Sequence, residues 1–191
     1  MKTKNFFRRV MMSLCAVVLA TMSSCNFTNK NNPSDPSSKP SDSGTEEAFM
    51  GAYAQYAYAA TDDMIDLLNI KIEYLDGDGK TQTVTLTEPS WSKRVEAKKV
   101  PAKFGMRVNI TMKGTADQTK YKSIAINYTA SYISTLKDAQ GKSTGTVHKN
   151  ANVVEKKIGP NELSEWIENY KKKPAQFWFE YDANGNFKLS D

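Results

Sequence analysis

The segment FGMRVNITM, residues 104–112, is the clearest β-strand in the sequence. Every second residue is apolar, beginning with Phe104, and the polar residues Arg107 and Asn109 lie on the opposite side. A period of two is typical of a strand that buries one face and leaves the other in water. Antiparallel sheets tolerate one wet face, whereas parallel sheets are covered on both. The segment therefore predicts a strand of an antiparallel sheet, with Val108 facing the core.

Residues 121–133 repeat this alternation, with Ile126 on the apolar side and Asn127 on the other. Shorter strands are predicted on both sides of this pair, over residues 48–60, 70–74, 82–87, 91–97, 177–181 and 187–189. Residues 146–158 predict one further strand or a pair of strands, residues 62–68 a short helical turn or loop, and residues 101–103 a turn. The pattern predicts a mainly all-β fold, an antiparallel immunoglobulin-like β-sandwich. The alternative is an up-and-down β-barrel with an added helix, since the same number of strands can close into a barrel.

One α-helix is predicted near the C-terminal end of the chain, over residues 161–173. Its apolar residues follow the helical spacing i, i+3, i+4 and i+7: Leu163, Trp166, Ile167 and Tyr170. Asn161 can cap the helix, and the lysines from Lys171 to Lys173 suit the negative end of its dipole before Pro174. We expect the apolar stripe to pack on a sheet.

A tight turn is predicted at Asp76-Gly77-Asp78-Gly79, because Asp-Gly pairs supply the positive φ angles that short hairpins need. Asp76 and Asp78 also open a D-x-D pattern, as calcium-binding loops do. The pattern then fails, since Lys80 stands at the third ligand position and Thr87 where a closing Glu belongs. We therefore predict a plain turn and no metal site.

Residues 1–24 have the order of a secretory signal. Basic residues come first, among them Lys2 and Arg9, and an apolar run follows before Cys25. The run is about a dozen residues long, shorter than the roughly 20 that a membrane-spanning helix needs. The segment is therefore predicted to be an export signal that is removed.

The residues before Cys25 resemble the lipobox of bacterial lipoproteins, in a relaxed form of the Bacteroidota type. Met22 stands where Leu is usual, and Ser24 where Gly or Ala is usual. The resemblance covers the leader alone and implies that Cys25 carries a lipid. The alternative is an ordinary secretory signal that is cleaved near Ala20 or Ser23.

The composition after the leader points to a tether and one domain. Residues 25–45 are rich in Asn, Ser and Pro and predict a disordered tether, whereas residues 46–191 have the size of a single domain. Four of the 26 Lys and Arg lie in the leader, so 22 face 21 Asp and Glu in residues 25–191, a net charge of +1. This near balance argues against a nucleic-acid partner. Removal of Cys15 and lipidation of Cys25 leave no thiol for a disulfide, a metal site or a nucleophile.

Residue types for catalysis are sparse. His148 is the only histidine, and its neighbours predict an exposed strand. Acidic pairs such as Glu46 and Glu47 are adjacent in sequence, so on a strand or helix their side chains diverge. The sequence contains no phosphate-binding or cofactor motif. We therefore predict no catalytic residue, metal or cofactor.

A surplus of aromatic residues is the remaining signal. In a domain without disulfides, filling of the core accounts for most of them. Trp178 differs, because it alternates with Phe177 and Phe179 and must face away from them. We predict that Trp178, with Trp91 second, forms an aromatic surface for a glycan or a partner protein.

These signals predict a membrane-anchored lipoprotein of the cell envelope that acts as a non-enzymatic binding or structural module. The lipid on Cys25 would attach it to the outer membrane. Surface-exported lipoproteins of the Bacteroidota type, which the leader resembles, often carry acidic residues just after the lipidated Cys. Here the first acidic residue is Asp35, and this departure favours a domain facing the periplasm over one at the cell surface. The alternative function is a hydrolase whose carboxylates converge only in the folded chain.

Overall fold

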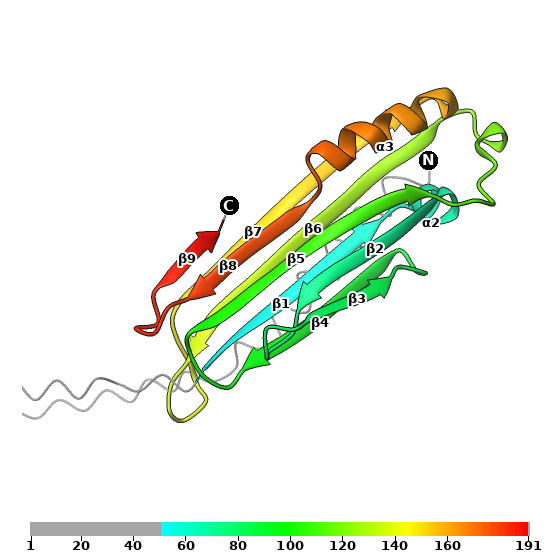
Figure 1. The fold of residues 1–191 in the computed structure, drawn as a ribbon. Coiled ribbons are helices and arrows are strands. Elements are labelled where there is room, and N and C mark those ends of the chain that lie inside the picture. Colours follow the sequence, from blue (N-terminus) through cyan, green and yellow to red (C-terminus); the bar gives the residue numbers. More distant parts are fainter. Residues whose placement is uncertain (1–50, 191) are drawn as a thin grey trace, which may run out of the picture. The chain divides into compact units, whose positions relative to one another are not determined.

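The structure, a computed structural model, describes residues 51–190, which fold into two antiparallel sheets packed face to face (Figure 1). The predicted β-sandwich is confirmed. Within these residues the two sheets remain separate, so the closed-barrel alternative is wrong. The described residues belong to one compact unit. The predicted signal, Cys25 and the tether lie outside the described residues.

Each sheet consists of consecutively hydrogen-bonded antiparallel strands. The first sheet has the order β4-β1-β6-β7. Its strands are β1 (Gly51–Ala60), β4 (Ser90–Ala97), β6 (Ile124–Lys137) and β7 (Ser143–Ile158). The second sheet has the order β3-β2-β5-β8-β9. Its strands are β2 (Leu68–Leu75), β3 (Thr81–Thr85), β5 (Ala102–Met112), β8 (Gln176–Tyr181) and β9 (Phe187–Ser190). The helices are α2 (Asp62–Leu67), η1 (Gln118–Lys120), η2 (Pro160–Glu162) and α3 (Leu163–Lys172).

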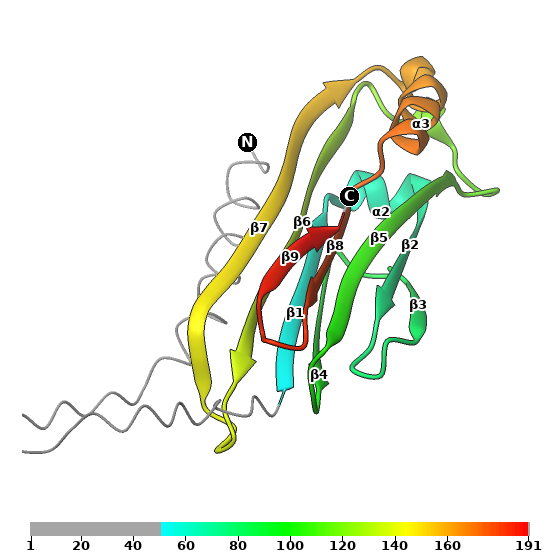
Figure 2. The same ribbon diagram turned by 60° about the vertical axis from the view of Figure 1, so that its left-hand side comes forward.

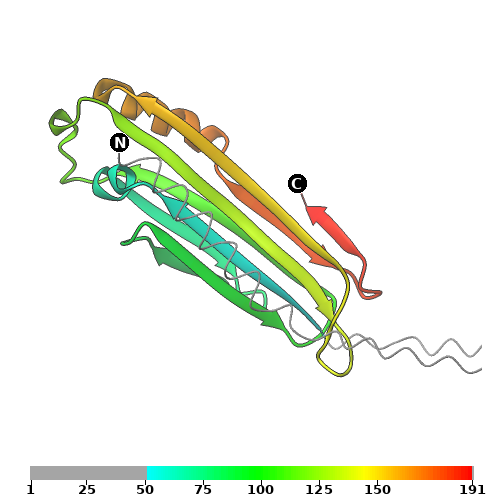
Figure 3. The ribbon, with the colours of Figure 1, turned by 180° about the vertical axis from the view of Figure 1, so that it is seen from behind.

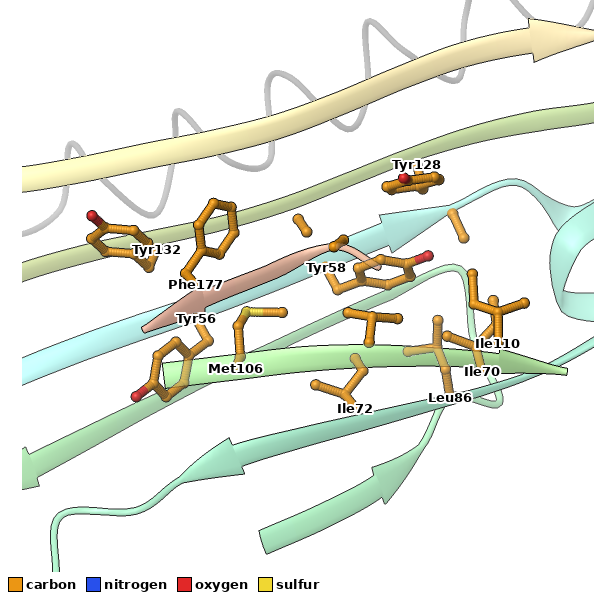
Figure 4. Packing of buried hydrophobic residues seen from close by; sticks show 14 of the residues in the cluster. Tyr56, Tyr58, Ile70, Ile72, Leu86, Met106, Ile110, Tyr128, Tyr132 and Phe177 are labelled. Carbon is orange, nitrogen blue, oxygen red and sulfur yellow. The ribbon is translucent and has the colours of Figure 1, made fainter. Parts of the chain in front are cut away.

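The core lies between the sheets and is rich in tyrosine (Figure 4). Val108 of β5 and Ile126 of β6 are fully buried, as the alternation of their segments predicts. Six tyrosines are buried as well: Tyr56, Tyr58, Tyr128, Tyr132, Tyr170 and Tyr181. The ring of Tyr132 stacks on that of Phe179 across the two sheets, with centroids 4.4 Å apart. Most of the aromatic surplus therefore fills the core.

Helix α3 spans from the end of β7 to the start of β8 and covers one end of the interior (Figure 2). The hydroxyl of Tyr170 donates to the carbonyl of Val108 at 2.9 Å and accepts from the amide of Ala175 at 3.1 Å. The predicted cap at Asn161 is wrong, because a 3₁₀ turn precedes the helix. Instead, the Glu162 carboxylate accepts from the Gly159 amide and satisfies a donor at this end.

Three more sequence predictions concern segments whose structure depends on neighbouring strands. The segment 146–158, predicted as one strand or a pair, forms part of one strand, β7, because β6 pairs with it along nearly its whole length. Ala102 and Lys103 belong to β5 and not to a turn, since β8 pairs with both. His148 lies half-buried, with its ring stacked on that of Phe187 at a centroid distance of 3.8 Å.

One turn of five residues occurs three times in the sandwich. It begins with an aspartate, carries glycine with positive φ at its fourth position, and joins β2 to β3, β6 to β7, and β8 to β9. In each copy the aspartate carboxylate accepts from the amides two and four residues later. The copies start at Asp76, Asp138 and Asp182. The hairpin predicted at Asp76 is thereby confirmed, and its carboxylate is occupied by the turn.

Candidate functional site

Trp178 lies on the outer face of the second sheet. Its neighbours Phe177 and Phe179 are buried, and its partner across the ladder is Gly105 of β5. A Cβ atom at Gly105 would lie 2.1 Å from Cε3 of the indole and 2.6 Å from Cζ3. The six-membered ring of Trp178 therefore rests on the backbone of β5, and only glycine leaves room for it.

A shallow depression of about 350 Å³ opens beside the indole. It is lined by Leu75, Lys103, Phe104, Trp178, Phe179 and Ser190. The lining thus joins apolar surface to one cation and one hydroxyl. This combination suits a ligand with an apolar face and polar edges.

A hydroxyl from the opposite sheet supports the floor of this region. Beyond Tyr74 the ladder between β2 and β5 ends, and the hydroxyl of Tyr56 takes the place of the missing pair. It accepts from the amide of Gly105 at 2.9 Å and donates to the carbonyl of Leu75 at 3.3 Å. Burial raises the pKa of Tyr56 well above its ordinary value, so the hydroxyl keeps the proton that it donates. Tyr56 thus fixes the two strands on which the depression is built.

The rim of the depression carries charges of both signs. The Nζ atom of Lys103 lies 3.9 Å from the Glu180 carboxylate, and the Lys103 side chain is 76% exposed. An ion pair in such an exposed position contributes little to stability. Both side chains are therefore able to turn toward a ligand at small cost.

Trp91 lies elsewhere in the fold. It pairs with the buried Tyr58 across the β1–β4 ladder and faces the interior at the margin of the first sheet. Its ring lies 5.4 Å from that of Tyr74. The structure therefore does not bring Trp178 and Trp91 together into one surface. Trp91 shares a face of β4 with Val95 and Ala97, which are both buried, so the alternation of the segment agrees with its inward orientation.

A charged cluster that the sequence did not predict lies on the first sheet. The Arg94 guanidinium stacks over the ring of Tyr53 at 4.0 Å. The carboxylate of Glu96 accepts from Lys137 at 3.0 Å and from Arg94 at 2.9 Å. The hydrogen bond from Lys137, together with the two positive charges, lowers the pKa of Glu96. The register of β4, β1 and β6 creates this cluster, and it covers Tyr53, which is therefore not an open platform.

The carboxylates with shifted pKa values serve local structure. The pKa values of Asp76, Asp117 and Asp182 are lowered, chiefly by hydrogen bonds from the turn that each begins. A general acid needs the opposite shift. Among residues 51–190, no group of three or more His, Cys, Asp or Glu side chains is placed to hold a metal ion.

No helix within residues 51–190 is long and apolar enough to cross a bilayer.

Comparisons of the chain with protein-family models, with curated proteins and with solved structures find no match.

Proposed function

We propose that the protein is a lipoprotein of the cell envelope whose β-sandwich binds a glycan through Trp178. The observation that carries this proposal is the indole resting on Gly105 beside a depression with a polar rim. The C–H face of a sugar ring is apolar, whereas its hydroxyls need hydrogen-bonding partners. An aromatic ring that rests on the sheet at Gly105 meets the first requirement, and Lys103 and Ser190 meet the second.

Binding without hydrolysis fits the lining better than the alternative of a carboxylate-dependent hydrolase. Glycoside hydrolysis ordinarily needs two carboxyl groups on either side of the bond that is cut. The residues that line the depression include neither Asp nor Glu. Glu180 stands at the rim beside Lys103, and a single acid does not supply both roles.

The lipid anchor belongs to the same proposal. A lipid on Cys25, followed by the tether of residues 26–45, would hold the domain close to the outer membrane on its periplasmic side. Replacing Cys25 by serine should move the protein from the membrane fraction to the aqueous fraction or leave it unprocessed. Membrane association that survives Cys25→Ser, with lipid label still attached, would disprove lipidation at this residue.

Glycan binding is tested by tryptophan fluorescence of the unchanged protein, and affinities of the variants are compared by isothermal titration calorimetry, which does not depend on a tryptophan. We expect purified peptidoglycan fragments or one member of a panel of bacterial and plant polysaccharides to change the emission of the protein. Trp178→Ala should then weaken binding at least about tenfold, as loss of a central aromatic contact does. Trp166→Ala, on the helix α3, is the matched control and should leave affinity unchanged. Equal affinity of both variants would place the site elsewhere.

A further inference from the structure

Strand β7 is a long edge strand. It is the outermost strand of the first sheet and has 16 residues, whereas the other three edge strands have 8, 5 and 4. Figure 3 shows it along the margin of the sheet. Among the described residues, β6 alone pairs with it. Proteins usually protect such an edge, because its unpaired amides and carbonyls are a template for another strand.

The register shows which backbone groups of β7 face outward. The carbonyl of Asn127 accepts from the amide of Thr61, which directly follows β1. In this part of β6 the backbone groups of odd-numbered residues therefore point toward β1, and those of even-numbered residues point toward β7. Ile126 pairs with Lys156, and the even-numbered residues of β7 therefore bond to β6. The odd-numbered residues direct their amides and carbonyls away from the sheet. The amide of Ala151 accordingly bonds only to the neighbouring Asn150 side chain, at 2.8 Å.

The regular part of this edge begins at His148. The ladder shifts between Ser134 and Leu136, where three residues of β7, numbers 145–147, face a single residue of β6. From His148 to Ile158 the pairing is continuous. A bulge at the start of the strand disfavours further pairing of that part, whereas no bulge interrupts the regular part.

The side chains along the regular part are complementary to a reversed copy of themselves. An antiparallel pair of two β7 strands centred on Asn152 places Lys149 of each copy opposite Glu155 of the other. The same register places Ala151 opposite Val153, which is 53% exposed. Within residues 51–190 neither Lys149 nor Glu155 takes part in an ion pair. Opposite charges directly across a ladder stabilise it.

Other symmetric registers fit less well. Centring on Lys149 would place the two lysines opposite each other, which is unfavourable. Centring on Asn150 would bring Val147 of the bulge into the ladder and leave Lys149 and Glu155 without opposite charges across the strands. The register about Asn152 uses regular strand alone and pairs both charges.

We propose that the protein forms a two-fold dimer in which the β7 strands of two copies pair antiparallel about Asn152. The first sheets of the two copies then join into one continuous sheet. The contact is small and polar, so we expect it to be weak in dilute solution. Attachment of both copies to one membrane would raise their effective concentration and favour it.

Cysteine cross-linking tests the proposed register of the two β7 strands. The full chain is expressed in bacteria with its own leader, so that it is exported to the cell envelope. In the proposed dimer, Asn152 of one copy lies opposite Asn152 of the other in a pair that exchanges no backbone hydrogen bonds. The Cα atoms of such a pair lie about 4.5 Å apart. This distance permits a disulfide, so Asn152→Cys should give a covalent dimer under mild oxidation. Asn150→Cys is the matched control. Its two copies would lie about 13 Å apart along the strands, beyond the reach of a disulfide.

Charge reversal tests the proposed ion pairs independently, in a Cys25→Ser background by sedimentation. Glu155→Lys should weaken association severalfold, and adding Lys149→Glu to the same chain should restore it. A covalent dimer of Asn152→Cys together with this rescue supports the proposal. The proposal is overturned if Asn150→Cys cross-links equally well, or if neither cysteine gives a dimer. Cross-linking of Asn152→Cys to a chain of different mass would also overturn it and would indicate that a different protein pairs with this edge.

Discussion

Replacing Gly105 by alanine is the sharpest test of how Trp178 is held. The new Cβ would lie 2.1 Å from Cε3 of Trp178 and 2.8 Å from the carbonyl oxygen of Phe177. The indole must leave its place on β5, or the strands must separate. Overpacking of this kind costs about 1–3 kcal/mol in the free energy of unfolding.

The cost should depend on the indole. In a Trp178→Ala background the two indole carbons nearest to the new Cβ are gone, whereas the carbonyl oxygen of Phe177 remains 2.8 Å away, so part of the cost persists. Trp178→Ala itself should cost about 1–3 kcal/mol, less than for a fully buried tryptophan, because the side chain is half-buried. We therefore expect the loss in free energy of unfolding of the double variant to be about 1–2 kcal/mol smaller than the sum of the losses of the two single variants.

Urea unfolding of residues 46–191, monitored by circular dichroism, gives the free energies of unfolding of the unchanged protein, the two single variants and the double variant. Tryptophan fluorescence is unsuitable as the only probe, since one arm removes a tryptophan. Similar m-values in all four proteins would show that the unfolded states are comparable. The reasoning fails if Gly105→Ala destabilises both backgrounds equally, because the indole then does not occupy the space above Gly105.

Two further predictions concern the core and the turns. Val108→Ala and Ile126→Ala should each lower the free energy of unfolding by about 1–4 kcal/mol, because both side chains are fully buried; unchanged urea midpoints would contradict their placement. The amide of Asn186 and other donors of its turn lower the pKa of Asp182 to about 2, from an ordinary value of 3.8. Its stabilising effect is therefore complete above about pH 5 and is lost progressively as the pH falls through about 2, so Asp182→Asn should make the unfolding midpoint depend less on pH over that range.

Alternation predicted the faces of the strands well. At Val108 and Ile126, burial follows from the period of two, since a strand with one apolar face has a single favourable orientation. The turn at Asp76 was equally readable, because its geometry depends on local residues alone. The same logic predicted that Trp178 faces away from Phe177 and Phe179.

What the sequence did not contain is the pairing of strands distant along the chain. That Gly105 lies beneath Trp178 depends on the register of β5 with β8, and no local pattern specifies it. The contact of Trp91 with Tyr74 likewise depends on the pairing of β4 with β1 and on the packing of the two sheets. The hydroxyl of Tyr56 completes the floor from the opposite sheet, so this part of the site exists only after the two sheets pack.

The two proposed contacts lie on different sheets, and this separation has a functional consequence. Trp178 belongs to the outer face of the second sheet, whereas the β7 edge belongs to the first. Pairing of two copies through β7 therefore leaves both Trp178 surfaces open. A dimer would offer two such surfaces to one polymeric glycan, and the second contact would form at a high effective concentration. The affinity of each surface for a glycan can then be low, as we expect for a depression as shallow as the one beside Trp178, while the tethered pair still holds a long chain.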